Sequence, residues 1–506
     1  MIRLDRRICI MDYTNKNFSI KNGRNLTMLV DFYELTMGNG YLESNAQDQI
    51  AYFDMFFRRV PDGGGFCVMA GVQQVIEYLS NLSFSEEDID YLRSKGMFSE
   101  KFLAYLKDFR FTCDVWAIPE GTPIFPHEPL LTVRGPVIQA QFIETMILLT
   151  INHQTLIATK ANRICRAAGD RPVMEFGSRR AHSYDAAIYG ARAAIIGGCS
   201  STACTIAEEM FGMPAVGTMA HSWVQLYDSE YEAFKAWAEI NPGDCTLLVD
   251  TYNTIKSGIP NAIRVFDEIL KPMGIRPKGI RIDSGDITYL TKKCREMLDA
   301  AGYEDTGIVI SNSLDEFIIR DVLSQGASID SLGVGERLIT SKSEPVFGGV
   351  YKLCAVEDKE SGELIPKIKI SDNEEKITNP GFKKVYRIYE KGTDMAAADL
   401  ITLHDEVIDD SKPIEIFDPV YTWKKKKFRN HYVKELMVQI FDKGECVYTS
   451  PEVMDIRQYT KEQVAKLWPE VLRFESPHNY YVDLSTYLWK LKHELIQKFS
   501  DEYEEK

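Results

Sequence analysis

Side chains able to bind phosphate, carboxylate or a metal ion follow a series of short apolar segments in the middle of the chain. The clearest examples lie between Val173 and Trp223, where the apolar pieces 173–176 and 214–216 each lead into glycine and then into polar residues. The groups that follow such segments are Arg179 and Arg180, Ser200 and Ser201, Thr218, His221 and Ser222, Asp250 and Asn253, Arg281, Asp283, Ser284 and Asp286, Ser311 and Asn312, and Gly333, Gly335 and Glu336. Fixed arginines, carboxylates and a Gly-x-Gly turn together are what a phosphate-bearing substrate with a metal ion requires.

Each type of group has its own chemistry. An arginine guanidinium is a planar fork that binds carboxylate or phosphate bidentately. Aspartates at strand ends hold Mg2+ directly or through water, and they stabilise positive charge developing on a sugar carbon. Asp250 taken alone is explained equally well as a cap of the following turn. His221 is able to act as a general base, a metal ligand or a phosphate acceptor. The chain has no G-x-x-x-x-G-K-[ST] sequence, so ATP, if used, is not held in a P-loop.

An alternation of strand and helix patterns must position these groups. Strands are predicted at 173–176, 194–197, 214–217, 246–249, 279–282, 308–310 and 329–332. Helices are predicted at 201–210, 261–273 and 287–301, and a further helix follows a capping box at residues 313–316. In parallel α/β folds, functional groups collect at the carboxyl ends of the strands. The pattern therefore predicts the α/β class, with an irregular, TIM-like α/β barrel that is closed or nearly closed.

A length of 506 residues predicts more than one domain. We expect a loose arm over residues 1–25, an α+β domain over 26–170, the α/β barrel over 171–353, and a C-terminal region over 354–506 that packs on both. Within the α+β domain, strands are predicted at 51–58 and 114–133, and helices at 73–106 and 139–166.

Composition and charge exclude several classes of function. The net charge of −15 and the pI near 5.2 argue against a general nucleic-acid binder, which needs a basic surface. The ten cysteines include no C-x-x-C pair, which favours reduced thiols in a reducing compartment. The apolar runs are too short for a signal peptide or a membrane span. We expect a soluble, cytoplasmic protein that binds neither nucleic acid nor membrane.

Seven motifs carry a resemblance to the nicotinate phosphoribosyltransferase family. They are DFYELTM at 31–37, EFGSRRA at 175–181, GTMAHSW at 217–223, LLVDTYNT at 247–254, GIRIDSGD at 279–286, GVGERLIT at 333–340 and GGVYKL at 348–353. They follow the order found in that family and span about 320 residues. The resemblance implies a barrel joined to an α+β domain, in a homodimer that shares its active sites. It also implies ligase-type, ATP-coupled transfer of phosphoribose from 5-phosphoribosyl 1-diphosphate to nicotinate, in NAD salvage by the Preiss–Handler route.

The resemblance also assigns the nicotinate site. Tyr33 and Phe176 would sandwich the pyridine ring, which suits stacking of flat aromatic groups. Arg281 would pair with the nicotinate carboxylate, and Thr218 would lie against the same ligand.

The remaining assignments concern the donor, the metal and ATP. The expected donor-binding residues are Arg179, Ser284, Gly333 and Gly335. Asp250 and Asp283 would act catalytically beside the ribose and would hold Mg2+, directly or through water. His221 would take the phosphoryl group from ATP as a phosphohistidine. ATP is thus a co-substrate, Mg2+ is the expected cofactor, and no prosthetic group is expected.

Glu336 departs from the family pattern, because some members have threonine there near the donor's phosphates. A carboxylate would repel phosphate unless its side chain turns away or reaches a cation. Three alternatives stay open. A nicotinamide phosphoribosyltransferase would carry an acid in the loop at 217–219, which has none here. A quinolinate phosphoribosyltransferase would need more basic groups, and a non-catalytic sensor of phosphoribosyl metabolites would not need His221.

Overall fold

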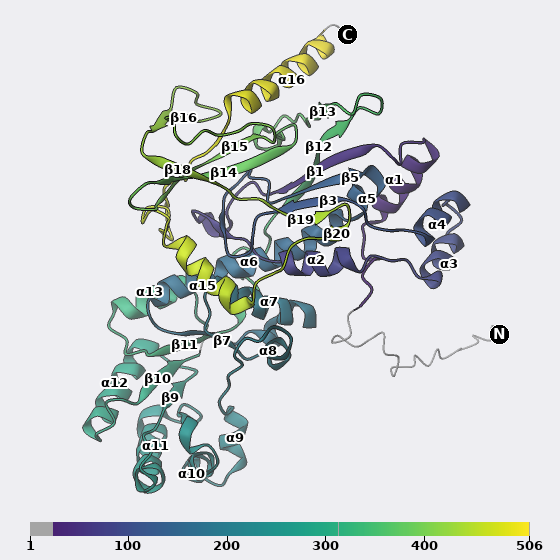
Figure 1. Cartoon of the computed structure of the whole chain (residues 1–506). Helices are drawn as coiled ribbons and strands as arrows, with labels where there is room; N and C mark the ends of the chain where they lie inside the picture. The colour runs from purple at the N-terminus through teal and green to yellow at the C-terminus, as the bar shows by residue number, and fades with distance from the viewer. Residues whose placement is uncertain (1–23, 312, 505–506) are drawn as a thin grey trace, which may run out of the picture.

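The computed structural model describes residues 24–311 and 313–504, so most of the predicted arm, and Asn312, lie outside the described residues. A seven-stranded and a four-stranded sheet lie on one side of the long helix α6 (Glu144–Ala168), and a six-stranded sheet lies on the other (Figure 1). No helix in the described part of the chain is long and apolar enough to cross a membrane.

The six-stranded sheet is parallel throughout, with the order β7-β6-β11-β10-β9-β8. Its strands are β6 (Val173–Glu175), β7 (Ser201–Thr202), β8 (Thr246–Leu248), β9 (Gly279–Ile282), β10 (Gly307–Ile310) and β11 (Ser331–Val334). The mixed α/β class is confirmed. Among the described residues no strand pairing joins β8 to β7, so the closed, TIM-like barrel stays a prediction.

Two strand predictions in this region are wrong. Residues 194–197 form the last turn of α7 (Tyr184–Gly197) and are buried against α6, because a short apolar run fits a buried helix as well as a buried strand. Residues 214–217 form no strand, since only Ala215 makes a bridge, with Thr202. The strand in this part of the chain is β7, which lies between these two segments in the sequence, where a helix was predicted to begin.

The further helices of this half are α8 (Thr205–Phe211), α9 (His221–Leu226), α10 (Glu230–Ile240), α11 (Ile259–Val265), α12 (Ile287–Ala300), α13 (Glu316–Ser324) and α14 (Glu336–Ile339). Four of them, α8, α11, α12 and α13, overlap the predicted helices, and α9, α10 and α14 were not predicted. The helical turns after α11 continue to Met273. The predicted capping box is wrong in detail, because Asp315 caps α13: its Oδ1 accepts from the amides of Phe317 and Ile318.

The seven-stranded sheet is antiparallel and joins segments distant in the sequence, in the order β13-β12-β1-β5-β3-β19-β20. Its strands are β1 (Ile50–Phe56), β3 (Asp114–Ala117), β5 (Leu131–Pro136), β12 (Val350–Glu357), β13 (Leu364–Pro366), β19 (Val438–Asp442) and β20 (Glu445–Cys446). The helices on this side are α1 (Phe32–Glu43), α2 (Val72–Ser80), α3 (Glu86–Ser94), α4 (Glu100–Lys107) and α5 (Val137–Phe142). The predicted strands at 51–58 and 114–133 are thereby confirmed.

The C-terminal third contains more strand than the sequence suggested. The four-stranded sheet consists of β18 (His431–Glu435), β14 (Lys383–Glu390), β15 (Ala396–Leu403) and β21 (Val482–Leu484). β16 (Ile414–Phe417) pairs with β17 (Lys425–Phe428). The end of the chain consists of α15 (Val453–Val464), a loop with β21, and α16 (Thr486–Glu504). α15 packs on α7, which ties the C-terminal part to the parallel half (Figure 1).

Candidate active site

The guanidinium of Arg281 lies at the centre of a polar cluster at the carboxyl ends of the parallel strands. Its Nε donates to Ser311 Oγ at 2.7 Å, and its Nη1 donates to Thr218 Oγ1 at 2.8 Å and to the Met219 carbonyl at 3.3 Å. Its Nη2 donates to Asp283 Oδ1 at 3.3 Å. The side chain is 14% exposed. Four of the five N–H donors are therefore engaged, and one on Nη2 is open to a ligand.

Two aspartates hold the loop after β9 against the loops after β8 and β10. Asp250 Oδ2 accepts from the Asp283 amide at 3.0 Å and from Ser284 Oγ at 2.6 Å. Asp283 Oδ1 accepts from Ser311 Oγ at 2.5 Å. The other oxygen of Asp250, Oδ1, is buried without a hydrogen-bond partner among the described residues. Asp250 thus braces the neighbouring loop instead of capping its own turn, and it keeps an acceptor free.

His221 lies at the first position of α9, beside this cluster. Its Nδ1 is 3.1 Å from Thr251 Oγ1. Its Nε2 is 3.6 Å from Asp283 Oδ2, which is too long for a hydrogen bond. The imidazole is 39% exposed, so its ring orientation is fixed from one side while Nε2 stays accessible.

The ring of Phe176 packs against β11 at Gly333, which has no side chain. A Cβ on Gly333 would lie 2.7 Å from Phe176 Cε2 and closer still to Cδ2, so only glycine lets the ring rest on β11. The Arg281 guanidinium carbon lies 5.9 Å from the centre of the same ring. An aromatic face and a fixed cation therefore border one space, as a planar aromatic acid would require.

Sequence reasoning overlooked the residue that holds the Phe176 loop. Glu175 is fully buried; its Oε2 accepts from Thr202 Oγ1 at 2.6 Å, and its Oε1 accepts from the Gly177 amide. Burial raises the pKa of this carboxyl above its ordinary value, against those two hydrogen bonds. An acidic residue inside a three-residue apolar strand was the available signal. Thr251, beside His221, was likewise not singled out.

Two predicted residues are not joined to the cluster. Arg179 lies in the turn after β6, is exposed and has no hydrogen-bond partner in the described part of the chain. Tyr33 is 43% exposed and lies on α1, which is hydrogen-bonded to Thr145 at the start of α6 and is well apart from the parallel strands (Figure 1). Within one chain, Tyr33 and Phe176 therefore do not face each other across a common site.

Several other strand-end polar residues have local structural roles. Asn253 and Asp286 cap the following helical turns through the amides of Lys256 and Tyr289. Ser200 donates to the Val173 carbonyl at 3.1 Å. Gly335, by contrast, lies where a Cβ would be 3.1 Å from the Phe176 carbonyl oxygen, so it belongs to the site.

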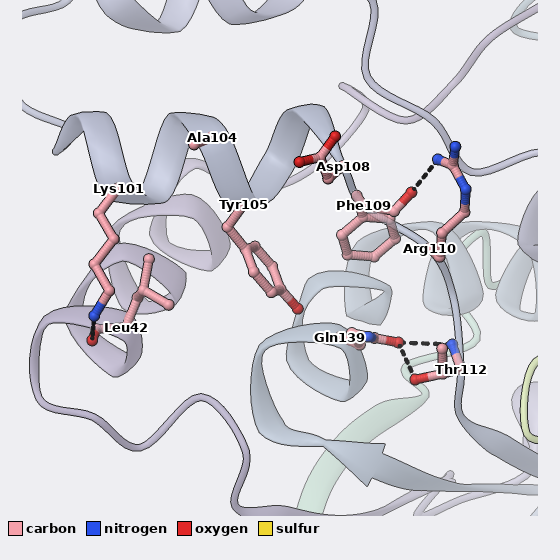
Figure 2. A pocket seen from close by; sticks show the side chains of 9 residues that line it. All are labelled: Leu42, Lys101, Ala104, Tyr105, Asp108, Phe109, Arg110, Thr112 and Gln139. Atoms are coloured by element: carbon pink, nitrogen blue, oxygen red, sulfur yellow. Dashed lines mark hydrogen bonds between the residues drawn. The ribbon is translucent and has the colours of Figure 1, made fainter.

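Two cavities lie outside the cluster. One, of about 550 Å³, is bordered by α1, α4 and α5 (Figure 2). Its Lys101 and Arg110 donate to the carbonyls of Leu42 and Phe109, and its Gln139 accepts from Thr112, so these three polar side chains are already paired. The other, of about 390 Å³, is lined by Arg180, His182, Glu336, Thr340, Lys342 and Pro345, beside the loops of the site.

The parallel sheet carries an arginine, two aspartates and a histidine at the carboxyl ends of its strands. This arrangement is typical of α/β proteins that bind small anionic ligands at that edge of the sheet. Comparisons with known proteins refine this class. Residues 28–152 match the model of the nicotinate phosphoribosyltransferase N-terminal domain, and residues 382–492 match that of its C-terminal domain. Nicotinate phosphoribosyltransferase of Bacillus subtilis is 44% identical over 484 residues, covering 95% of this chain and 98% of the relative. The chain therefore belongs to the nicotinate phosphoribosyltransferase family.

Solved structures agree with this assignment. The crystal structure of human nicotinic acid phosphoribosyltransferase superposes with a TM-score of 0.80 at 26% identity, covering 92% of this chain and all of the human one. A nicotinate-nucleotide pyrophosphorylase from Pyrococcus furiosus gives a TM-score of 0.66 at 26% identity, covering 87% of this chain and 96% of that one.

Proposed function

We propose that the chain joins nicotinate to 5-phosphoribosyl 1-diphosphate, giving nicotinate mononucleotide and diphosphate, as an ATP-coupled enzyme of NAD salvage by the Preiss–Handler route. The observation that carries the proposal is the Arg281 guanidinium, fixed by Thr218 and Ser311 beside the Phe176 ring. Membership of the family supplies the reaction, because the B. subtilis relative is named for it.

The base site selects an aromatic acid. The open donor of Arg281 would bind the nicotinate carboxylate, and the Phe176 face would stack on the pyridine ring. The loop at 217–219 carries no acid that would repel a carboxylate or accept a hydrogen bond from an amide. This arrangement favours nicotinate over nicotinamide.

Asp250 and Asp283 suit the transfer step. The Asp250 carboxylate accepts from the Asp283 amide at the strand ends, where the two acidic groups would stabilise the positive charge that develops on the ribose as diphosphate leaves. They also suit Mg2+, since Asp250 Oδ1 is a buried acceptor without a partner. No group of three or more His, Cys, Asp or Glu side chains in the described chain is arranged for a metal, but Mg2+ typically uses one or two carboxylates together with substrate phosphates. When bound, Mg2+ would neutralise charge on the donor's diphosphate.

His221 would couple ATP to the transfer. Nε2 has no hydrogen bond to any described residue, so it is the nitrogen that would attack the terminal phosphorus of ATP, with ADP leaving. In that tautomer Nδ1–H donates to Thr251 Oγ1, which orients the ring.

Tyr33 requires a second copy of the chain. It lies on α1 with Phe32 and Met37, and Leu29 precedes this helix; all four residues are more than a third exposed. We propose a homodimer in which α1 of one chain covers the strand ends of its partner, so that Tyr33 closes the base site opposite Phe176.

The ATP step has a direct test. Wild-type chain and His221→Asn would be incubated with nicotinate, donor and Mg2+, with and without ATP, and mononucleotide would be measured. We expect ATP to raise turnover in the wild type by about tenfold or more, and to have no effect on His221→Asn, whose amide cannot carry a phosphoryl group. Equal ATP stimulation in both proteins would refute the role of His221. Absence of mononucleotide under all conditions would refute the proposed function.

A further inference from the structure

The cavity of about 390 Å³ next to the site gathers cationic side chains in a chain whose net charge is −15. Arg180 comes from the turn after β6, His182 follows that turn, and Lys342 follows α14. All three are exposed, and the side chains of Arg180 and His182 make no hydrogen bond in the described part of the chain. Their donors are therefore free to bind a ligand.

The only acid that lines this cavity is Glu336, and it is paired. Lys342 Nζ lies 2.7 Å from Glu336 Oε1, with the two side chains 59% and 46% exposed. The Lys342 ammonium, with help from Arg180 and Arg337, holds the pKa of Glu336 below its ordinary value. Because both side chains are exposed, solvent and salt screen this pair and make it weak, so a more strongly charged anion is able to replace the carboxylate.

The segment that carries Lys342 is held firmly from behind. Ser341 lies just after α14 and its C-cap, and it has a left-handed backbone conformation (φ 42°). This conformation turns the chain immediately before Lys342. The next residue, Ser343, accepts from the buried Lys160 Nζ at 2.8 Å. Glu344 accepts from the Asp62 amide and pairs with Arg59, both at 2.7 Å. The backbone around Lys342 is thus fixed, while its side chain stays free to change partner.

The position of the cavity indicates what it binds. It lies between the β6 turn that carries Arg179 and the β11 turn that carries Gly333 and Gly335, the residues assigned to the phosphoribosyl donor. A phosphate dianion has more charge and more acceptor oxygens than a carboxylate, so it would compete well for the same cations.

We propose that Arg180, His182 and Lys342 form a phosphate subsite, and that Glu336 occupies it as an internal counter-ion which a phosphate of the substrate displaces. The phosphate belongs to the donor or to ATP, and this identity alone rests on the proposed function. The subsite also explains why a glutamate is tolerated at position 336, because its carboxylate reaches a cation. An incoming phosphate must bind these cations more strongly than the Glu336 carboxylate does.

The test is calorimetric binding of the donor and, separately, of ATP, each with Mg2+, to wild type, Lys342→Ala, Glu336→Gln and the control Lys293→Ala. Lys293 forms an equally short exposed pair with Glu296, at 2.7 Å, on α12. We expect Lys342→Ala to weaken binding of one of the two ligands by about tenfold, the worth of one charged hydrogen bond. Glu336→Gln should tighten binding of that same ligand by about threefold or more, because the competing carboxylate is gone. Lys293→Ala should change neither.

The opposite signs of the two effects decide the matter. The ligand whose affinity changes identifies the source of the phosphate. If both variants weaken binding equally, the pair is only structural and the proposal is overturned; unchanged binding of both ligands overturns it as well. If wild type binds neither ligand, the proposed function fails. The subsite is then tested by titration with inorganic diphosphate: Lys342→Ala should weaken its binding and Glu336→Gln should tighten it.

Discussion

Arg281 is fixed by the protein before any ligand arrives, because Ser311, Thr218 and Asp283 each accept a hydrogen bond from it. Such preorganisation favours specificity, since the cation does not have to be reoriented on binding. Lysine at this position would keep the charge but lose the planar fork.

We therefore predict that Arg281→Lys raises KM for nicotinate by roughly 10- to 100-fold, the effect of losing about 1.5–3 kcal/mol from a charged hydrogen bond. KM for the donor should stay within about twofold in steady-state assays. Arg171→Lys is the matched control, because Arg171 bonds the Ile329 carbonyl, before β11, at the opposite ends of the strands. An unchanged KM for nicotinate in Arg281→Lys would contradict the carboxylate role.

At the scale of elements, the close approach of β6 and β11 sets the shape of the base site. Phe176 lies directly on Gly333, and the carboxyl of Glu175 holds the turn that follows. Any side chain at Gly333 would push the ring towards the space assigned to the ligand.

Gly333→Ala should therefore raise KM for nicotinate by about tenfold and destabilise the fold by about 1–3 kcal/mol, as overpacking typically does. The measurements are steady-state kinetics and urea unfolding. Gly243→Ala is the control, because a Cβ there would meet no atom within 4 Å. Identical kinetics for both variants would show that the ring position does not matter.

The sequence predicted correctly those strands whose apolar residues are followed directly by polar ones. β8, β9 and β10 have apolar residues followed at once by polar ones, and the strand-end rule correctly brought Arg281, Asp283 and Asp250 together. It failed at residues 194–197, whose apolar run is buried equally well in a helix. It could not find Lys342, because that side chain depends on a turn after a four-residue helix and on contacts with Asp62 and Lys160 far away in the chain.

At the scale of the whole molecule, the proposed dimer would use the exposed aromatic residues of α1 to complete the base site. Tyr33 is 43% exposed on α1, beside the antiparallel sheet, while Phe176 follows β6 of the parallel sheet and lies next to Arg281. A two-fold dimer would place each residue opposite the other in two equivalent sites.

This arrangement predicts complementation between two inactive variants. Tyr33→Ala and Arg281→Ala should each lose most activity, yet a co-expressed mixture should recover about a quarter of wild-type activity, since half of the dimers are mixed and each has one intact site. Differently tagged subunits would establish that mixed dimers form. Mixed dimers without recovered activity would show that Tyr33 does not act across the interface.

The most direct test of the account as a whole is a comparison of kcat/KM for nicotinate and nicotinamide, with saturating donor, Mg2+ and ATP. A fixed arginine beside an aromatic ring, with no acid in the loop at 217–219, predicts a preference for nicotinate of about 100-fold or more. Equal use of the two bases, or a preference for nicotinamide, would contradict the assignment of Arg281 to a substrate carboxylate.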